Sequence, residues 1–245
     1  MIAKNEAHQI ANAISSAQQI AAEIIVVDTG SSDGTIEVAR SLGASVSQFE
    51  WDNNFSNARN FALNHCTGDW VLSLDCDEVF DISRKDMEVL ASACRDAAKV
   101  GYSIPILNLL SDGCWREHHS LRLFRNHKSI FYTNPIHESV AYSIAESYPP
   151  NAIGNITFPI LHFGYASGKN SEKLLRNLDL LGEWIKEDPQ NPYALFKFGC
   201  TIKALDPSAA KRVLRQSLAL VCATGGSSVH PFFNELLEVL SDCPA

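Results

Sequence analysis

The sequence lacks a run of apolar residues that approaches the roughly 20 residues needed to span a bilayer. Positive charge is also scarce, because 20 Lys and Arg stand against 28 Asp and Glu, for a formal net charge of −8. Such a balance gives no global positive field that would attract nucleic acid or anionic lipid. The composition therefore argues against general nucleic-acid binding.

Two further absences concern the cellular compartment. Residues 1–6 lack the apolar segment of roughly 7–15 residues and the cleavage site that mark a secretory signal. The seven Cys are odd in number and form no CxxC pair, so neither a disulfide framework nor a zinc knuckle is indicated. We expect reduced thiols and a cytoplasmic location.

What is present is the composition of a globular chain. Hydrophobic residues make up 46% of the sequence and charged residues 20%, which is the range of globular proteins. The length of 245 residues is enough for one large domain, or for a domain with a small appendage.

The first third of the chain alternates apolar runs with amphipathic segments. Residues 23–28 are an apolar run closed by Asp28, a pattern typical of a parallel strand covered on both faces. Further strands are expected at 44–49 and 70–75, with helices at 36–42 and 56–65. Strands that alternate with helices predict a parallel α/β sheet.

The pattern changes twice further along the chain. Four apolar segments after Gly101 predict a mixed or antiparallel half: 102–109, 120–124, 130–132 and 156–163. After Gly168 the apolar spacings of three and four residues predict an all-helical tail.

An acidic cluster, residues 75–78, follows the buried strand 70–75. Ligands of open α/β sheets lie beyond the carboxyl ends of the strands, where a divalent cation can bridge carboxylates to a diphosphate. Alone, such a cluster is more often a solvated turn. Asp28 at the end of another strand and Arg59, a bidentate donor for phosphate or a base carbonyl, favour the ligand site.

These residues belong to segments that resemble family-2 glycosyltransferases of the GT-A fold, in the family's order: 1–6 (MIAKNE), 25–35 (IVVDTGSSDGT), 55–60 (FSNARN) and 68–78 (GDWVLSLDCDE). Later segments are similar to the branch with a helical, tetratricopeptide-like extension: 121–126 (LRLFRN), 135–138 (PIHE) and 161–165 (LHFGY). The resemblance covers residues 1 to about 185. It implies a GT-A domain over 1–168, with a mixed sheet flanked by helices, and a helical extension over 169–245.

The resemblance implies transfer of a sugar from a nucleoside-diphosphate donor, usually a UDP-sugar, with inversion at the anomeric carbon. Glu6 and Asp28 would line the nucleoside pocket, and Arg59 would face the nucleotide or its diphosphate. Asp75 would lie near the ribose, and Asp77 would ligate Mg²⁺ or Mn²⁺. A cation of this kind offsets the charge that builds on the leaving diphosphate.

Inversion also requires a base that takes the proton of the acceptor. Our candidate is Glu138, which follows His137 in a segment that the resemblance places beside the acceptor. The alternative for Glu138 is a structural hydrogen-bonded couple with its neighbour. His162, at the end of an apolar strand, is a candidate additional metal ligand, and its alternative is a satisfied core histidine.

Two positions depart from the family pattern. Thr29 stands where many relatives carry a second acid, which weakens any expectation about base recognition. The family's first strand has several apolar residues before the position of Met1, so we expect a short first strand here. A short strand would weaken the sheet or leave the nucleoside pocket incomplete.

Three functions are compared on this basis. The first is a metal-assisted glycosyltransferase that acts on a glycan, a lipid-linked molecule or a peptide, without a transmembrane segment and with peripheral membrane contact left open. The second is a non-catalytic nucleotide-sugar-binding module whose helical tail binds a partner. The third, ranked lowest, is a sugar nucleotidyltransferase, because the glycine-rich triphosphate loop that it needs is absent from residues 4–7.

Overall fold

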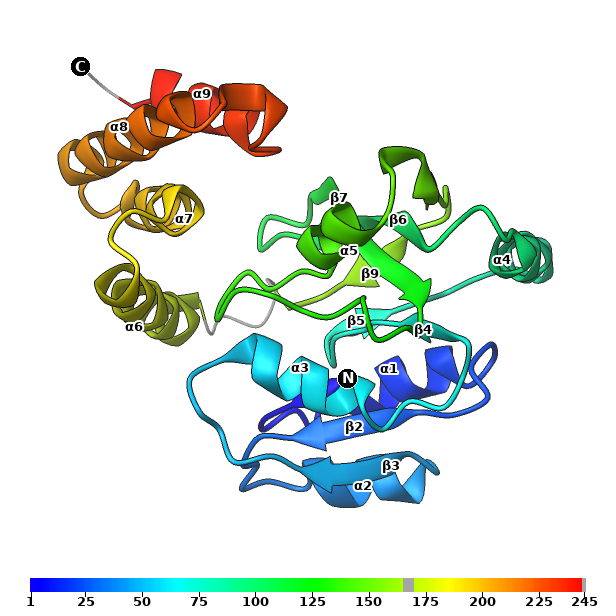
Figure 1. Cartoon of the computed structure of the whole chain (residues 1–245). Helices are drawn as coiled ribbons and strands as arrows, with labels where there is room; N and C mark the ends of the chain where they lie inside the picture. The colour runs from blue at the N-terminus through cyan, green and yellow to red at the C-terminus, as the bar shows by residue number, and fades with distance from the viewer. Residues whose placement is uncertain (165–169, 244–245) are drawn as a thin grey trace. The chain divides into compact units, whose positions relative to one another are not determined.

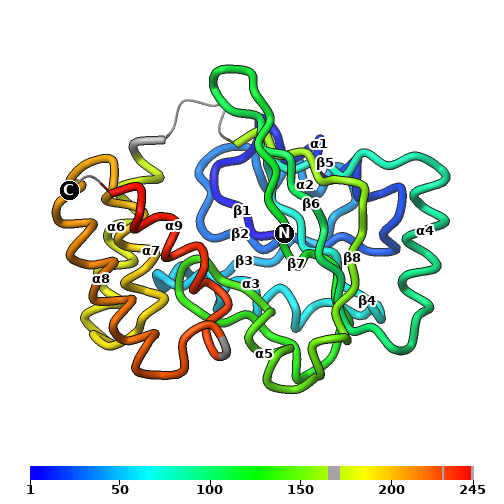
Figure 2. The backbone as a smooth tube through the Cα atoms, turned by 90° about the horizontal axis from the view of Figure 1, so that it is seen from above, coloured from blue at the N-terminus to red at the C-terminus, as the bar shows by residue number. Residues whose placement is uncertain are grey.

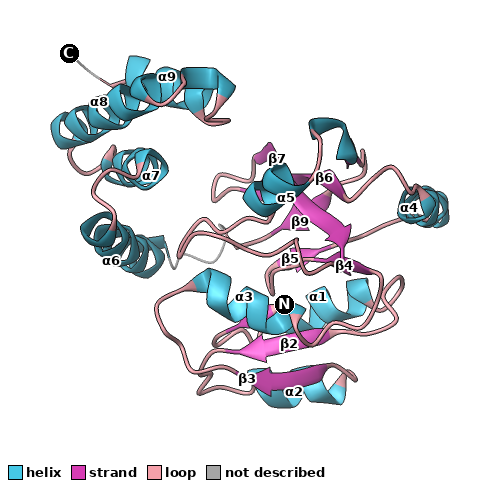
Figure 3. Ribbon diagram, in the orientation of Figure 1, coloured by secondary structure: helices cyan, strands magenta, loops and turns pink. Residues whose placement is uncertain are grey.

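The computed structural model describes residues 1–164 and 170–243. The chain divides into two compact units, Met1–Gly168 and Lys169–Ala245, and each is described by itself. Strands and helices make up the first unit, and helices make up the described part of the second (Figures 1 and 3).

The first unit begins with alternating strands and helices: β1 (Ile2–Ala3), α1 (Ile10–Ala17), β2 (Ile25–Asp28), α2 (Thr35–Ser41), β3 (Ser45–Gln48) and α3 (Phe55–Leu63). The three strands form a parallel sheet in the order β1-β2-β3. Val26 and Val27 in the central strand are fully buried, which confirms the predicted apolar strand. Gly43, with φ of +80°, adopts after α2 the left-handed conformation that commonly follows a helix.

A second, mixed sheet follows: β4 (Trp70–Leu72), β5 (Glu78–Val79), β6 (Gly101–Leu109), β7 (Trp115–Arg125), β8 (Ile153–Asn155) and β9 (Ile160–His162). Its strand order is β4-β7-β6-β9-β5, and β8 pairs with the first part of β6. The long hairpin of β6 and β7 is antiparallel, whereas β9 runs parallel to β6. Figure 2 shows the tip of this hairpin projecting from the sheet. The expectation of a mixed second half is confirmed.

Helix α1 joins the cores of the two sheets. Ile10 and Ile14 on one side of the helix pack in the core of the first sheet, with Val26 of β2. Ala13 and Ala17 on the other side pack in the core of the second sheet. Helix α1 is therefore packed into both hydrophobic cores of the first unit.

Several elements differ from the expected ones. Residues 130–132, predicted as a strand, are not a strand: Ile130 and Tyr132 are buried against Phe124, and the backbone of Tyr132 hydrogen-bonds to the side chain of Asn60 instead of to a neighbouring strand. Three helices were not predicted: α1, α4 (Arg84–Arg95) and α5 (Ala141–Ser147). The sequence does carry a signal for α4, because Ser83 and Asp86 form a reciprocal capping box at its start.

The second unit contains α6 (Asn170–Glu187), α7 (Pro192–Ile202), α8 (Pro207–Ala223) and α9 (Phe233–Ser241), which pack in sequential pairs. Asn191 and Asp206 cap α7 and α8, each followed by a proline in the first turn. Phe196 of α7 and Phe232 stack at a centroid distance of 5.1 Å in the core. The expectation of a helical tail is confirmed. Over residues 1–164 and 170–243, we find no helix that is both long and apolar enough to cross a membrane.

Candidate functional site

A buried cluster of two arginines and three carboxylates lies where α3, β7 and the turn after β4 meet. Asp75 is at its centre, with Oδ1 2.6 Å from Arg59 Nη2 and Oδ2 3.1 Å from Arg122 Nη2. Arg122 Nη2 is also 2.5 Å from Glu78 Oε1, and Arg59 Nε is 2.6 Å from Glu138 Oε1. The structure thus brings together three residues predicted for the site, Arg59, Asp75 and Glu138.

The arginines determine which carboxylates of the cluster are charged. Burial opposes the ionisation of Asp75, but the charges of Arg59 and Arg122 outweigh it and hold the pKa of Asp75 far below its usual value. At Glu78, by contrast, burial prevails and raises the pKa to about 7 against the opposing charge of Arg122. Of these two neighbouring carboxyl groups, Asp75 is therefore the one that the arginines hold ionised.

Arg59 uses its guanidinium group within the protein. It lies on α3, whose first turn is capped by the side chain of Asn54, and only 9% of its surface is exposed. Besides its two carboxylate partners, Nη1 donates to Ser73 Oγ at 3.3 Å, and the group lies 5.5 Å from the centroid of the Tyr132 ring. Arg59 consequently fixes the orientation of neighbouring side chains.

Glu138 lines a cavity of about 120 Å³ beside the ion-pair cluster. The other residues around the cavity are Arg59, Ser73, Asp75, Ser120, Leu121, Arg122, Tyr132 and Ser139. Because Arg59 holds Oε1 of Glu138, the carboxylate has a fixed position at this cavity.

Asp77 and His162 meet where β5 pairs with β9. Asp77 Oδ2 lies 3.3 Å from His162 Nε2, and the Asp77 carbonyl accepts a hydrogen bond from Phe163 N at 2.9 Å. The backbone of Gly164 packs directly against this pair and leaves no room for a side chain, since a Cβ at that position would lie 2.6 Å from His162 Nε2 and still closer to Asp77 Oδ2. Burial alone would lower the pKa of His162, but its hydrogen bond to Asp77 raises the pKa above the usual value.

The predicted nucleoside-binding residues lie at the carboxyl ends of β1 and β2. Asp28 is 1% exposed, and its Oδ2 accepts hydrogen bonds from Gly30 N and Ser31 N, both at 3.0 Å. Its other oxygen, Oδ1, is buried without a hydrogen-bond partner in the part of the chain that the structure describes. Glu6 is half-buried, and its backbone N donates to Thr35 Oγ1 at 2.8 Å.

The acidic turn is attached to the end of β1. Cys76, between the two aspartates, is buried in the core of the first sheet, and its Sγ donates to the Ile2 carbonyl at 3.4 Å. Asp75 N donates to Glu78 Oε2 at 2.8 Å, which closes the turn. The turn therefore links the first sheet to β5 of the second.

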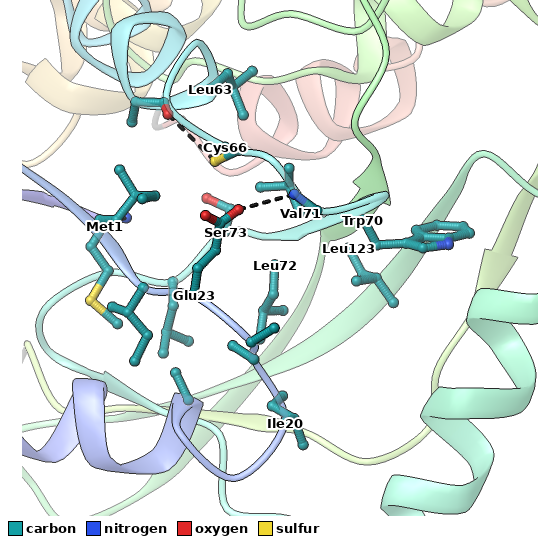
Figure 4. Close-up of a pocket in the computed structure, with 18 of the residues that line it drawn as sticks. Met1, Ile20, Glu23, Leu63, Cys66, Trp70, Val71, Leu72, Ser73 and Leu123 are labelled. Carbon is teal, nitrogen blue, oxygen red and sulfur yellow. Dashed lines mark hydrogen bonds between the residues drawn. The ribbon is translucent and has the colours of Figure 1, made fainter. Parts of the chain in front are cut away.

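A larger pocket of about 500 Å³ lies between β4 and the edge of β1 and β2 (Figure 4). The first strand is short, as expected, and the N-terminal amino group of Met1 donates to Ile25 O at 2.8 Å inside this region. The walls are mainly apolar, and the Glu23 carboxylate accepts from Thr67 N and Gly68 N. Because Asp28, Asp77 and His162 do not line this pocket, the candidate site lies at the acidic turn instead.

Comparison with known proteins identifies the family. The sequence model described as "Glycosyl transferase family 2" matches residues 1–153. This chain belongs to glycosyltransferase family 2. The matched segment of this family-2 chain includes the acidic turn and Glu138, and it ends before His162.

Solved structures show that the family-2 chain has the predicted GT-A fold. Glucosyl-3-phosphoglycerate synthase of Mycobacterium tuberculosis superposes with a TM-score of 0.54 at 15% identity, over 74% of this chain and 77% of the synthase. TarS of S. aureus superposes with a TM-score of 0.51 at 14% identity, over 98% of this chain and 52% of TarS. At these identities the likeness concerns the fold alone.

Curated relatives extend the similarity over most of the family-2 chain. A TPR repeat-containing protein of Synechococcus elongatus is 31% identical over 237 residues, which cover 89% of this chain and 55% of that protein. Glycosyltransferase SunS of Bacillus subtilis is 26% identical over 211 residues, which cover 84% of this chain and 49% of SunS. The chain thus spans about half the length of these relatives.

Sequence reasoning missed Arg122, the second cation of the cluster. The available signal was a charged residue between Leu121 and Leu123 in a strand that enters the core. An arginine that is withdrawn from solvent requires carboxylate partners. An arginine at this position of the strand therefore indicates an acidic cluster elsewhere in the chain.

We predict that Arg122→Met destabilises the protein by about 3–5 kcal/mol, because Asp75 and Glu78 lose a buried counter-charge. Arg116→Met, at an exposed position of the same strand, is the control and should change stability by less than about 0.5 kcal/mol. Urea unfolding followed by circular dichroism measures both. Equal stability of the two variants would contradict the role of Arg122.

Proposed function

We propose that the unit Met1–Gly168 transfers a sugar from a nucleoside-diphosphate donor, a UDP-sugar, to an acceptor group, with inversion at the anomeric carbon. The observation that carries this proposal is the convergence of Asp75, Glu138 and Arg59 in one buried cluster next to Asp77, within a family-2 glycosyltransferase domain. Donor-binding and acceptor-activating groups are then supplied by one contiguous part of the fold.

Asp28 and Glu6 recognise the nucleoside in this proposal. A buried carboxylate oxygen without a hydrogen-bond partner is costly, and Asp28 Oδ1 is such an atom. The imide N–H of uracil is a donor that would satisfy it. Glu6 follows the neighbouring strand, and the pairing of Ala3 with Asp28 brings the two strand ends together.

Asp77 and His162 hold a divalent cation, Mg²⁺ or Mn²⁺, in this proposal. Adjacent ligands of an octahedral ion bound at about 2.1 Å lie about 3 Å apart, which fits the 3.3 Å between Asp77 Oδ2 and His162 Nε2. Gly164 adds no side chain that would cover these two atoms. When bound, the cation supplies Lewis-acid stabilisation of the negative charge on the leaving diphosphate.

Two protein ligands suffice for such an ion. No group of three His, Cys, Asp or Glu side chains with metal-binding geometry occurs among residues 1–164 and 170–243. Mg²⁺ commonly takes one or two carboxylates and completes its shell with water and substrate phosphates. The Mycobacterium tuberculosis synthase, which shares the fold with a TM-score of 0.52, was solved with Mn²⁺ and uridine diphosphate, and this supports the same ligand class here.

Glu138 is the base in this proposal. Arg59 holds its Oε1, which leaves Oε2 to accept the proton of the acceptor as the acceptor attacks the anomeric carbon. The bond between that carbon and the diphosphate oxygen breaks in the same displacement, and the nucleoside diphosphate leaves. Arg59 orients Glu138 and also holds Asp75, which we assign to the ribose side of the donor.

A non-catalytic nucleotide-sugar-binding module is the second candidate. Donor binding by the wild-type protein without any transfer or donor hydrolysis would support it. The sugar nucleotidyltransferase alternative is dropped, because the matching family is one of glycosyltransferases.

We predict that Asp77→Asn weakens Mn²⁺-dependent UDP binding by about tenfold or more, equivalent to about 1.4 kcal/mol, because the variant loses an anionic cation ligand. Isothermal titration calorimetry with UDP, in Mn²⁺ and in EDTA, measures the effect. Asp81→Asn, at an exposed position nearby, is the control and should bind like the wild type. Unchanged binding by Asp77→Asn would remove Asp77 from the cation site.

We predict that Glu138→Gln lowers the single-turnover rate of sugar transfer or donor hydrolysis by roughly 10²–10⁴-fold. UDP affinity should stay unchanged, because the Gln carbonyl can still accept from Arg59 Nε. A panel of UDP-sugars supplies the donors, and Glu146→Gln on the exposed side of α5 is the matched control. Full activity of Glu138→Gln would refute Glu138 as the base.

A further inference from the structure

Strand β6 lies between β7 and β9 in the second sheet (Figure 1). Asn108 is the last residue but one of this strand. The register pairs Asn108 with Arg116 on one side and with His162 on the other. Asn108 is 5% exposed, and its side chain hydrogen-bonds to a residue of each neighbouring strand. Nδ2 donates to the Arg116 carbonyl at 2.9 Å, and Oδ1 lies 2.7 Å from His162 Nδ1.

These contacts determine the orientation of the amide group. The Arg116 carbonyl can only accept, so the atom facing it must be the amide nitrogen of Asn108. The same nitrogen lies 2.9 Å from His118 Nδ1, a second contact on that side of the amide. The amide oxygen is therefore the atom that faces His162.

The amide orientation in turn determines the proton position on His162. An amide oxygen only accepts, so Nδ1 of His162 must carry the proton of the 2.7 Å hydrogen bond. Nε2 lies 3.3 Å from Asp77 Oδ2 and donates to it while no cation is bound. A cation bound beside Asp77 would take the place of that proton, and the neutral ring would then keep its proton on Nδ1 and present the lone pair of Nε2. This is the tautomer that can donate an electron pair to a cation beside Asp77.

We propose that Asn108 is a positioning residue that fixes both the ring orientation and the tautomer of His162 for cation binding. The inference rests on the proposed function, because it takes the Asp77–His162 pair as the cation site. A second hydrogen bond of this kind is common for metal-binding histidines, and its loss typically costs 10–100-fold in metal affinity. A residue that merely joins the strands would leave the tautomer of His162 free to change.

Nuclear magnetic resonance of the metal-free protein tests the hydrogen bond directly. In ¹⁵N-histidine-labelled wild-type protein, we expect a slowly exchanging proton on Nδ1 of His162, with the signal assigned by its absence in His162→Gln. In Asn108→Leu, which removes all three side-chain hydrogen bonds at similar volume, we expect this proton to exchange rapidly and its signal to be lost. A wild-type His162 without a proton on Nδ1 would overturn the inference.

Mn²⁺ titration followed by electron paramagnetic resonance of the free ion provides the second readout. We expect Asn108→Leu to bind Mn²⁺ 10–100-fold more weakly than the wild type. Asn108→Asp keeps an acceptor for His162 Nδ1 but cannot donate to Arg116 O, so its affinity should lie closer to the wild type than that of Asn108→Leu. Asn155→Leu, at an exposed position of β8 in the same sheet, is the control and should bind like the wild type.

The two readouts separate this inference from the proposed function. Unchanged Mn²⁺ affinity in Asn108→Leu, with Asp77→Asn impaired, would overturn the role of Asn108 and leave the cation site intact. Wild-type protein that binds no Mn²⁺ would overturn the cation site itself, and with it the positioning role, while the spectrum still reports the hydrogen bond to His162.

Discussion

Compensation of buried charge around Asp75 is the constraint on which the rest of the site depends. The side chains of Arg59 on α3 and Arg122 on β7 are only 10% and 14% exposed, so their charges require partners, and each pairs with one oxygen of the half-buried Asp75. These partners come from elements that are distant in the sequence. The turn that carries Asp75 is consequently fixed between a helix that covers the first sheet and a strand of the second.

The position of this turn determines the position of the remaining acids. Cys76 attaches the turn to the end of β1, and the carbonyl of Asp77 attaches it to the segment that follows β9. Asp77 therefore meets His162, while Arg59 extends the same cluster to Glu138. One short turn thus connects the Asp77–His162 pair of the proposed mechanism to the cluster that holds its base, and position 164 beside the pair accepts only a glycine.

The sequence predicted the parts of the site that depend on local pattern. The apolar strand before Asp28 was visible, because a buried parallel strand and the polar residue at its end lie side by side in the sequence. The acidic turn was also visible, but the strand before it was wrongly expected in the parallel sheet: Trp70–Leu72 is a half-buried edge strand, antiparallel to β7. The pairing of Arg59 with Glu138, 79 residues apart, could not be read from local pattern, because it depends on the tertiary fold. The same reason explains why 130–132 packs in the core without becoming a strand: its backbone groups are hydrogen-bonded by the side chains of Asn60 and Ser143, which are distant in the sequence.

The most direct test of the central claim is anomalous diffraction from crystals grown with Mn²⁺ and UDP. The account predicts one Mn²⁺ peak bonded to Asp77 Oδ2 and His162 Nε2, with the diphosphate on the same ion and Asp75 still paired with both arginines. A peak away from the acidic turn, or a diphosphate bound in the apolar pocket between β2 and β4, would contradict it.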